Sequence, residues 1–152
     1  MRVYRIAKTQ YIRDLSGIGA RMYGGRWNKK GVGILYASEN RALATVEYLV
    51  HVPLSLVPGD LSMATIQIPD DISFKEISIS DLPTNWRNYP APPALAELGV
   101  QWVLANEHLL LRVPSAVVSG EFNILINLLH PDIKHVVLSH VETYRFDDRL
   151  LR

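Results

Sequence analysis

Apolar and polar residues alternate over several short segments of this chain, which is the pattern of half-buried β-strands. The segments expected to form strands are residues 3–7, 34–37, 61–68, 73–79, 109–118, 123–127 and 135–146. Turns are predicted at Pro69-Asp70-Asp71, between two of these strands, and at His130-Pro131-Asp132.

Two segments show helical spacing instead. Ser38 is a suitable N-cap for a helix over about residues 40–51, which Pro53 would stop. A second helix is predicted over residues 94–106, although Gly99 weakens it. The apolar stripe of this second helix consists of Leu95, Leu98, Trp102 and Ala105. About six strands with two helices, without a regular βαβ repeat, favour an α+β fold.

Composition limits the possible classes of protein. The chain has 152 residues, 48% of them hydrophobic, so we expect one domain over residues 1–152. Sixteen basic and fifteen acidic residues give a net charge of +1, which provides no electrostatic surface for duplex nucleic acid or anionic lipid. Cysteine is absent, which excludes disulfides, a thiolate metal site and a cysteine nucleophile.

Location and metal content can also be predicted. The N-terminus lacks the apolar core of a signal peptide, and no apolar run approaches the ~18 residues of a membrane span. We therefore expect a cytoplasmic protein. The five histidines have no recognisable ligand spacing, so no metal site is expected.

Most of the candidate functional residues lie in a glycine-rich stretch, residues 16–31, which has neither helical nor strand periodicity. Irregular loops of this length usually carry a site. Its five glycines allow close approach of a ligand to the backbone, and Arg26 offers planar donors that match phosphate. Trp27 could add a stacking face. The alternative is a hairpin turn at residues 28–31 with Trp27 in the core and Arg26 in solvent.

Glu47 is the second candidate for a functional residue. A helical projection places it at the edge of the apolar stripe, from where a carboxylate can reach into a cleft beside the core. A solvated surface glutamate is the alternative. Tyr36 precedes the helix and could face the same cleft, or could simply be a core residue of its strand.

Ser115 follows Pro114 in an otherwise apolar strand, where a proline indicates a sheet edge or a bulge. Its hydroxyl could bind a ligand or cap a local backbone group. The surrounding sequence lacks a G-x-S-x-G elbow, so Ser115 is not expected to be a hydrolase nucleophile.

Several of these motifs, in this order, resemble the RES domain family over nearly the whole chain. The matching residues are Gly24-Gly-Arg-Trp-Asn28, Gly31, Tyr36-Ala-Ser38, Ala44-Thr-Val-Glu-Tyr-Leu49, Arg112-Val-Pro-Ser115, and Asn127 with His130-Pro131. The arginine, glutamate and serine that give the family its name correspond to Arg26, Glu47 and Ser115. The family often has Asn-Pro before its His-Pro turn, whereas this chain has Asn127-Leu-Leu129.

The resemblance implies a bacterial toxin of a type II toxin–antitoxin pair, bound and neutralised by an Xre-type antitoxin in a hetero-oligomer. It also implies a single α+β domain with a mixed, mostly antiparallel sheet and a few helices, similar to ADP-ribosyltransferases. Members of the family cleave NAD at the nicotinamide–ribose bond by hydrolysis or phosphorolysis, so NAD is expected as a substrate and no separate cofactor is expected.

The resemblance also suggests roles for individual residues. Glu47 would stabilise the oxocarbenium-like ribose, Arg26 would bind pyrophosphate or a ribose hydroxyl, and Tyr36 would contact the nicotinamide end. Ser115 would fix the orientation of NAD. The catalytic set is thus Arg26, Tyr36, Glu47 and Ser115, and the residues expected to bind NAD are Arg26, Trp27, Asn28, Tyr36 and Ser115.

Three other functions remain open from the sequence. One is a protein mono-ADP-ribosyltransferase, in which a protein side chain replaces water or phosphate as acceptor. Another is a non-catalytic module that binds nucleotide or single-stranded nucleic acid. Its aromatic residues would be Trp27, Tyr36, Trp86 and Tyr89, with Arg26 and Lys29-Lys30 on phosphates. The third is a scaffold that binds only the antitoxin.

Overall fold

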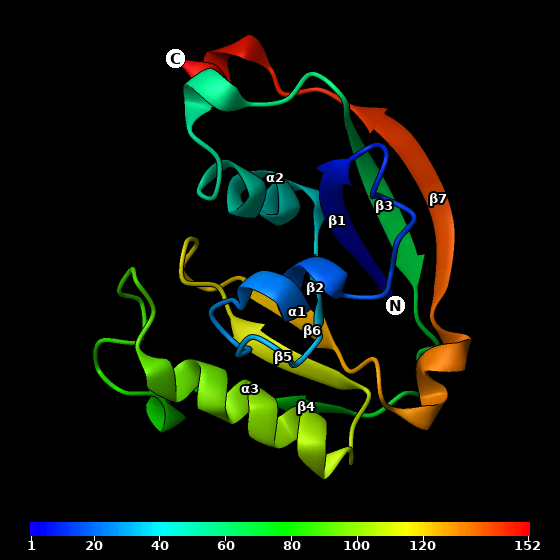
Figure 1. The fold of residues 1–152 in the computed structure, drawn as a ribbon, viewed down its shortest axis with the longest axis vertical. Coiled ribbons are helices and arrows are strands. Elements are labelled where there is room, and N and C mark those ends of the chain that lie inside the picture. The colour runs from blue at the N-terminus through cyan, green and yellow to red at the C-terminus, as the bar shows by residue number, and fades with distance from the viewer.

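The fold is built on one seven-stranded sheet surrounded by three α-helices, as a computed structural model of residues 1–152 shows (Figure 1). The strands follow the order β4-β5-β6-β2-β1-β3-β7. Only β4 and β5 are parallel, so the predicted α+β fold with a mixed, mostly antiparallel sheet is confirmed. The strands are β1 (Arg2–Lys8), β2 (Leu35–Ser38), β3 (Leu61–Gln67), β4 (Phe74–Glu76), β5 (Leu110–Pro114), β6 (Phe122–Ile126) and β7 (Val137–Tyr144). The helices are α1 (Ile18–Tyr23), α2 (Arg41–Leu49) and α3 (Pro93–Ala105).

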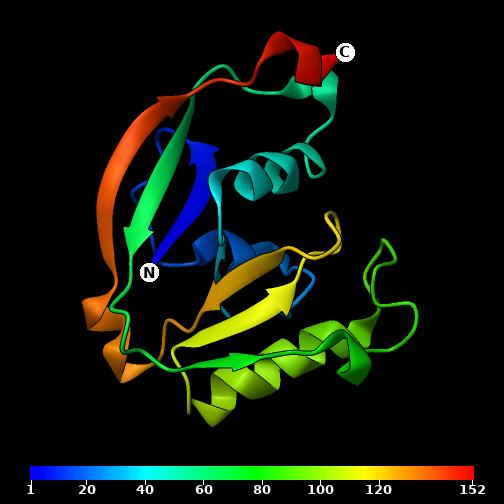
Figure 2. The same cartoon turned by 180° about the vertical axis from the view of Figure 1, so that it is seen from behind.

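The sheet nearly divides between β1 and β2. These strands share a single residue pair, Tyr4 with Ser38, whereas β1 pairs with β3 along its whole length. One half therefore consists of β1, β3 and β7, and the other of β2, β6, β5 and β4. In Figures 1 and 2 the two halves turn away from each other, and α2 lies beside β1 on the open side. The helix packs against both strands that meet at the division.

Strand alternation divides the core into two clusters on opposite faces of β5 and β6. Leu111 and Leu125 face α3, where they pack with Trp102. Leu110 and Ile124 point to the other face and pack with residues of β1, β2 and the end of β3. This two-sided burial explains why β5 and β6 are apolar almost throughout.

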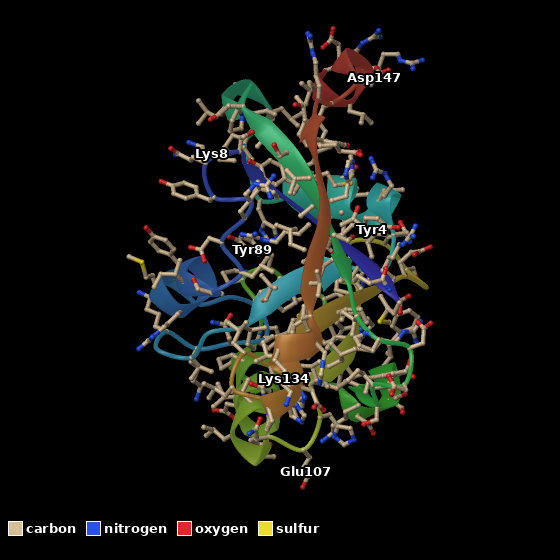
Figure 3. All side chains as sticks on the ribbon, turned by 90° about the vertical axis from the view of Figure 1, so that its right-hand side faces the viewer. Tyr4, Lys8, Tyr89, Glu107, Lys134 and Asp147 are labelled. Atoms are coloured by element: carbon tan, nitrogen blue, oxygen red, sulfur yellow. The ribbon has the colours of Figure 1, made fainter.

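The C-terminal strand forms one edge of the sheet. Figure 3, viewed from this side, shows β7 running along the molecule between labelled Lys134 near one end and Asp147 beyond the other. The edge carries polar side chains such as His140 and Glu142, whose Nε2 and Oε2 atoms lie 3.2 Å apart. None of the helices is both long enough and apolar enough to cross a membrane.

Some expected local features differ from the structure. The glycine-rich stretch is not wholly irregular, because residues 18–23 form the single short helix α1. The N-cap of α2 is Asn40, whose side chain accepts a hydrogen bond from the Leu43 N–H, and not Ser38. Both residue types cap helices well, so only the backbone path distinguishes them.

Two further details of the sheet come from the structure alone. The turn at residues 69–71 exists, but β3 and β4 are not neighbours, because the chain crosses to the opposite edge of the sheet before β4 begins. Of the two alternatives for Pro114, the structure has the sheet edge and not the bulge, because β5 has a partner on only one side there. The register of β5 with β6 is regular through Pro114, where β5 ends. The proline is tolerated because β4 pairs only as far as Arg112.

Gly99 explains how the glycine-rich loop is seated on the domain. A Cβ atom at position 99 would lie 1.7 Å from the carbonyl oxygen of Trp27, so only glycine allows this loop to contact α3. Trp27 itself is buried among the residues that pack against α3. Gly99 weakens α3 as a helix, but its lack of a side chain lets the loop that contains Arg26 pack against α3.

Replacing Gly99 with alanine tests this contact. Alanine normally stabilises a helix interior by about 0.5–1 kcal/mol relative to glycine. Here the clash with Trp27 is expected to reverse the sign and lower the free energy of unfolding by about 1–3 kcal/mol, measured by urea denaturation.

The matched control is Gly19→Ala in α1, where an added Cβ meets nothing within 4 Å. This variant should be as stable as the wild type or slightly more so. Equal effects of the two substitutions would contradict the proposed contact.

Candidate active site

A cavity of about 870 Å³ opens where the two halves of the sheet separate. Its wall is formed by β1, α1, the loop that follows α1, β2, α2 and the segments after β5. Three arginines line it, Arg5, Arg26 and Arg87, and Glu47 is the only acidic residue in the lining. The volume lies within the range of about 300–1,000 Å³ that is usual for small-molecule sites. Its charge favours an anionic ligand.

Glu47 projects from the middle of the packed face of α2. The buried residues of this helix are Leu43 and Ala44, which lie on either side of Glu47 in projection, whereas Ala42 and Val50 are exposed. Glu47 was expected at the edge of the apolar stripe, and this was wrong, because the face of α2 that packs is centred on Glu47 itself. The carboxylate reaches the cavity because the helix covers the opening in the sheet.

Two side chains hold the Glu47 carboxylate. Its Oε1 accepts hydrogen bonds from Ser115 Oγ at 2.7 Å and from Asn123 Nδ2 at 2.6 Å. No protein group donates a hydrogen bond to Oε2. Two donors on one oxygen fix the orientation of the carboxylate and leave the other oxygen available to a ligand in the cavity.

Ser115 lies behind Glu47 and does not line the cavity. The residue is 2% exposed, and its hydroxyl accepts hydrogen bonds from the backbone N–H groups of Val117 and Val118 while donating to Glu47. The hydroxyl therefore caps local backbone groups, as one of the two sequence-based alternatives expected, and also hydrogen-bonds to Glu47. This geometry favours action through Glu47 over direct contact with a ligand.

Arg26 lines the cavity and also fastens a distant loop. Nη1 donates to the carbonyl of Trp86 at 2.7 Å, and Nη2 donates to the carbonyl of Asn88 at 3.2 Å. Burial lowers the pKa of Arg26, an effect that the nearby Glu47 carboxylate opposes. Since a guanidinium has five N–H donors and two are used here, three remain for a ligand.

Tyr36 and Asn28 brace the loop around Arg26. The Tyr36 hydroxyl donates to Asn28 Oδ1 at 2.7 Å and accepts from the Trp27 N–H at 3.1 Å. Asn28 is 2% exposed, and its amide nitrogen donates to the carbonyls of Ala20 and Val32. Tyr36 lines the cavity with its ring, whereas Asn28 lies outside the lining. The structure therefore places Asn28 in support of the loop.

The aromatic residues differ in their exposure. Trp27 and Trp86 belong to the buried cluster against α3, with Tyr36 packed on it, although Trp27 also contributes to the cavity wall. Tyr89, in contrast, is 86% exposed. Of the four aromatic residues considered for base stacking, only Trp86 is buried and absent from the cavity wall.

Sequence reasoning missed Asn123, Arg5 and Arg87. Asn123 occupies a strand position where alternation suggests an ordinary polar residue, and only the fold brings it to Glu47. Arg5 lines the cavity while donating to the carbonyls of Ile12 and Asp14. Burial lowers the pKa of Arg5, and the Asp14 carboxylate opposes the shift.

The protein is thus an α+β domain with a cavity whose wall contains three arginines and a single carboxylate. Residues 2–147 match the family model described as the RES domain. The chain belongs to the RES domain family, and Arg26, Glu47 and Ser115, the three residues expected to carry its name, lie at or directly behind one cavity.

Curated relatives of the chain are toxins. It is 38% identical to a "Prs ADP-ribosylating toxin" of Sphingobium sp. (strain YBL2), covering 99% of this chain and 95% of that protein. It is 37% identical to a "Toxin Res" of Yersinia enterocolitica, covering 99% of both chains. A "Toxin Res" of Photorhabdus laumondii is 33% identical over 100% of this chain and 98% of its own length.

A solved structure has the same fold. A chain of the M. tuberculosis MbcT–MbcA toxin–antitoxin complex superposes with a TM-score of 0.77 and 17% identity, covering 99% of this chain and 86% of that one. The sequence similarity of this protein is thus to toxins, and its fold is that of a toxin–antitoxin component.

Replacing Tyr36 with phenylalanine tests the bracing of the loop. The substitution leaves the buried Asn28 Oδ1 without its donor, so the free energy of unfolding is expected to fall by about 1–3 kcal/mol. Tyr89→Phe is the matched control, because the Tyr89 hydroxyl is exposed, and its effect should stay within about 0.5 kcal/mol. Equal stabilities of the two variants in urea denaturation would refute the bracing role.

The same pair of variants has a pH signature. Burial raises the pKa of the Tyr36 hydroxyl above its usual value of about 10, so the unfolded chain loses this proton first. Stability is therefore expected to fall as pH rises above about 10, and Tyr36→Phe should remove part of that dependence. An unchanged slope in Tyr36→Phe would show that other groups cause the alkaline loss.

Proposed function

We propose that this protein is the toxin of a toxin–antitoxin pair and that it consumes NAD by breaking the bond between nicotinamide N1 and ribose C1′. The electron pair of this bond leaves with nicotinamide. Water or phosphate then forms a new bond to C1′ and loses a proton. The products are nicotinamide and either ADP-ribose or its 1″-phosphate.

The observation that supports this reaction best is the Glu47 carboxylate, oriented by Ser115 and Asn123 inside the cavity. Departure of nicotinamide leaves positive charge on the ribose, as in glycoside cleavage. A fixed carboxylate stabilises that charge without the cost of reorganising when the charge develops. The free Oε2 is the atom that would face the ribose.

The arginines fit the remainder of the substrate. NAD carries a pyrophosphate, and guanidinium groups bind phosphate oxygens through pairs of charge-assisted hydrogen bonds. Arg26 retains three N–H donors after binding the carbonyls of Trp86 and Asn88. Arg26 and Glu47 line the same cavity, so a ligand that reaches both is favoured when it has negative charge beside Arg26 and positive charge beside Glu47. NAD has this combination.

A protein acceptor is the second candidate function. The name of the Sphingobium relative states that it ADP-ribosylates Prs, and at 38% identity the same group transfer is a direct alternative here. The first step, loss of nicotinamide, is common to both functions. The two differ only in what attacks C1′, which product analysis distinguishes.

The partner would be an antitoxin. The MbcT–MbcA structure contains such a pair and shares this fold, which supports a protein partner for this chain as well. We propose an Xre-type antitoxin that covers the cavity between Arg26 and Glu47 in the cytoplasm, so the toxin must be assayed free of it.

The test is incubation of the purified, antitoxin-free protein with NAD, with and without phosphate, followed by chromatography of the products. Glu47→Gln keeps the size of the side chain and removes its charge, and it is expected to reduce nicotinamide release by at least about 100-fold. ADP-ribose indicates hydrolysis, and its 1″-phosphate indicates phosphorolysis.

The matched control is Glu97→Gln on the exposed face of α3, where Glu97 makes only a 3.5 Å ion pair with Lys29. This variant should release nicotinamide at the rate of the wild type. Full activity in Glu47→Gln would overturn the proposed mechanism. No release by the wild type in either buffer, together with ADP-ribose on an added protein, would favour the transferase.

A further inference from the structure

Asn123 connects the Glu47 carboxylate to the point where the two halves of the sheet meet. Its Nδ2 donates to Glu47 Oε1 at 2.6 Å, and its Oδ1 accepts from Ser38 Oγ at 2.7 Å. Asn123 and Ser38 face each other as a cross-strand pair of β6 and β2. Ser38 in turn pairs with Tyr4, the single paired position between β2 and β1.

The chemistry of the three groups fixes the direction of both hydrogen bonds. An ionised carboxylate only accepts, so the amide must present its NH2 group to Glu47. The amide oxygen then faces Ser38, whose hydroxyl can rotate to donate. Ser38 is 4% exposed, so its side chain is held in place beside that oxygen, and both residues belong to the cavity wall. A reversed amide would place two acceptors against each other at Glu47.

We propose that Asn123, oriented by Ser38, is a positioning residue for the Glu47 carboxylate in NAD cleavage. The inference rests on the proposed function and adds two residues to it. Ser115 alone leaves the carboxylate free to rotate about a single hydrogen bond to Oε1, whereas a second donor from β6 defines the plane in which Oε2 lies. The strand pair thus transmits the geometry of the sheet to the reacting group.

A structural role without an effect on Glu47 makes different predictions. A bond that only joins β2 to β6 would affect stability, and activity would fall with the folded fraction at every pH. A positioning role lowers kcat in fully folded protein and leaves KM nearly unchanged, because Glu47 acts mainly when charge develops. For Asn123→Ala we expect kcat to fall about 10- to 100-fold with KM within about threefold of the wild type.

Asn123→Asp provides the sharper test. At pH 8 two ionised carboxylates face each other, so residue 123 cannot donate and activity should be as low as in Asn123→Ala. As pH falls, one proton comes to be shared by the pair, and a protonated carboxyl group at position 123 donates as the amide did. We expect activity relative to wild type to rise by about tenfold between pH 8 and pH 5.

Asn127→Asp is the matched control. Asn127 directly follows β6 and is buried, but its amide donates to Val103 O and Asn106 Oδ1, away from Glu47. The same chemical change there should lower stability and leave the shape of the pH–rate profile unchanged. Equal pH responses of the two aspartate variants would overturn the inference.

Ser38→Ala tests the orientation of the amide. The substitution should reduce kcat less than Asn123→Ala does, and the double variant should be no worse than Asn123→Ala, because Ser38 acts through Asn123. Multiplicative losses would contradict this dependence. Thermal unfolding of each variant separates loss of folded protein from loss of turnover.

The outcomes distinguish this inference from the proposed function. A wild type that releases no nicotinamide, with or without an added protein acceptor, overturns both. An active wild type with an equally active, folded Asn123→Ala overturns only the role of Asn123. A crystal structure of Asn123→Ala gives a readout independent of turnover: we expect the Glu47 side chain to leave its position beside Ser115, and an unmoved carboxylate would refute the inference.

Discussion

The hydrogen bonds to Glu47 Oε1 link helix α2 to strand β6 and to the segment after β5. Glu47 belongs to α2, which packs on β1 and β2 beside the division of the sheet. Its two donors come from the half of the sheet that contains β5 and β6: Ser115 follows β5, and Asn123 lies in β6. The division creates the cavity, and these hydrogen bonds hold a charged group across it. Without them the carboxylate would have freedom to rotate in the opening.

The opposite wall depends on packing as well as hydrogen bonding. The loop with Arg26 lies against α3 only because position 99 has no side chain, and Tyr36 holds its backbone from β2. Arg26 then binds the carbonyls of Trp86 and Asn88, which positions the segment with Arg87 and Tyr89 along the same cavity. A glycine-rich sequence thus becomes an ordered wall through contacts supplied by distant residues.

Local pattern was sufficient for most of the strands and for both long helices, because alternation and helical spacing directly reflect which face is buried. It failed where the answer depended on distant parts of the chain. The position of β4 beside β5 is set by a crossing of the sheet, and the face of α2 that carries Glu47 is set by the opening it covers. Residue type alone could not decide between Ser38 and Asn40 as the helix cap.

The candidate site shows the same limit. Arg26, Glu47 and Ser115 could be proposed from the sequence through the family resemblance, but their arrangement could not. Ser115 and Asn28 support neighbouring groups from behind the cavity wall, while Asn123 reaches Glu47 from a position that looks like any polar residue of a strand. Such supporting contacts join residues far apart in the chain, as the 76-residue separation of Glu47 and Asn123 illustrates.

The most direct measurement is a crystal structure of the Glu47→Gln protein with NAD bound. The account predicts the nicotinamide ribose beside residue 47, on the side that Oε2 occupies in the wild type, and the pyrophosphate within hydrogen-bond distance of Arg26. NAD bound with its ribose away from residue 47, or bound outside the cavity, would contradict it.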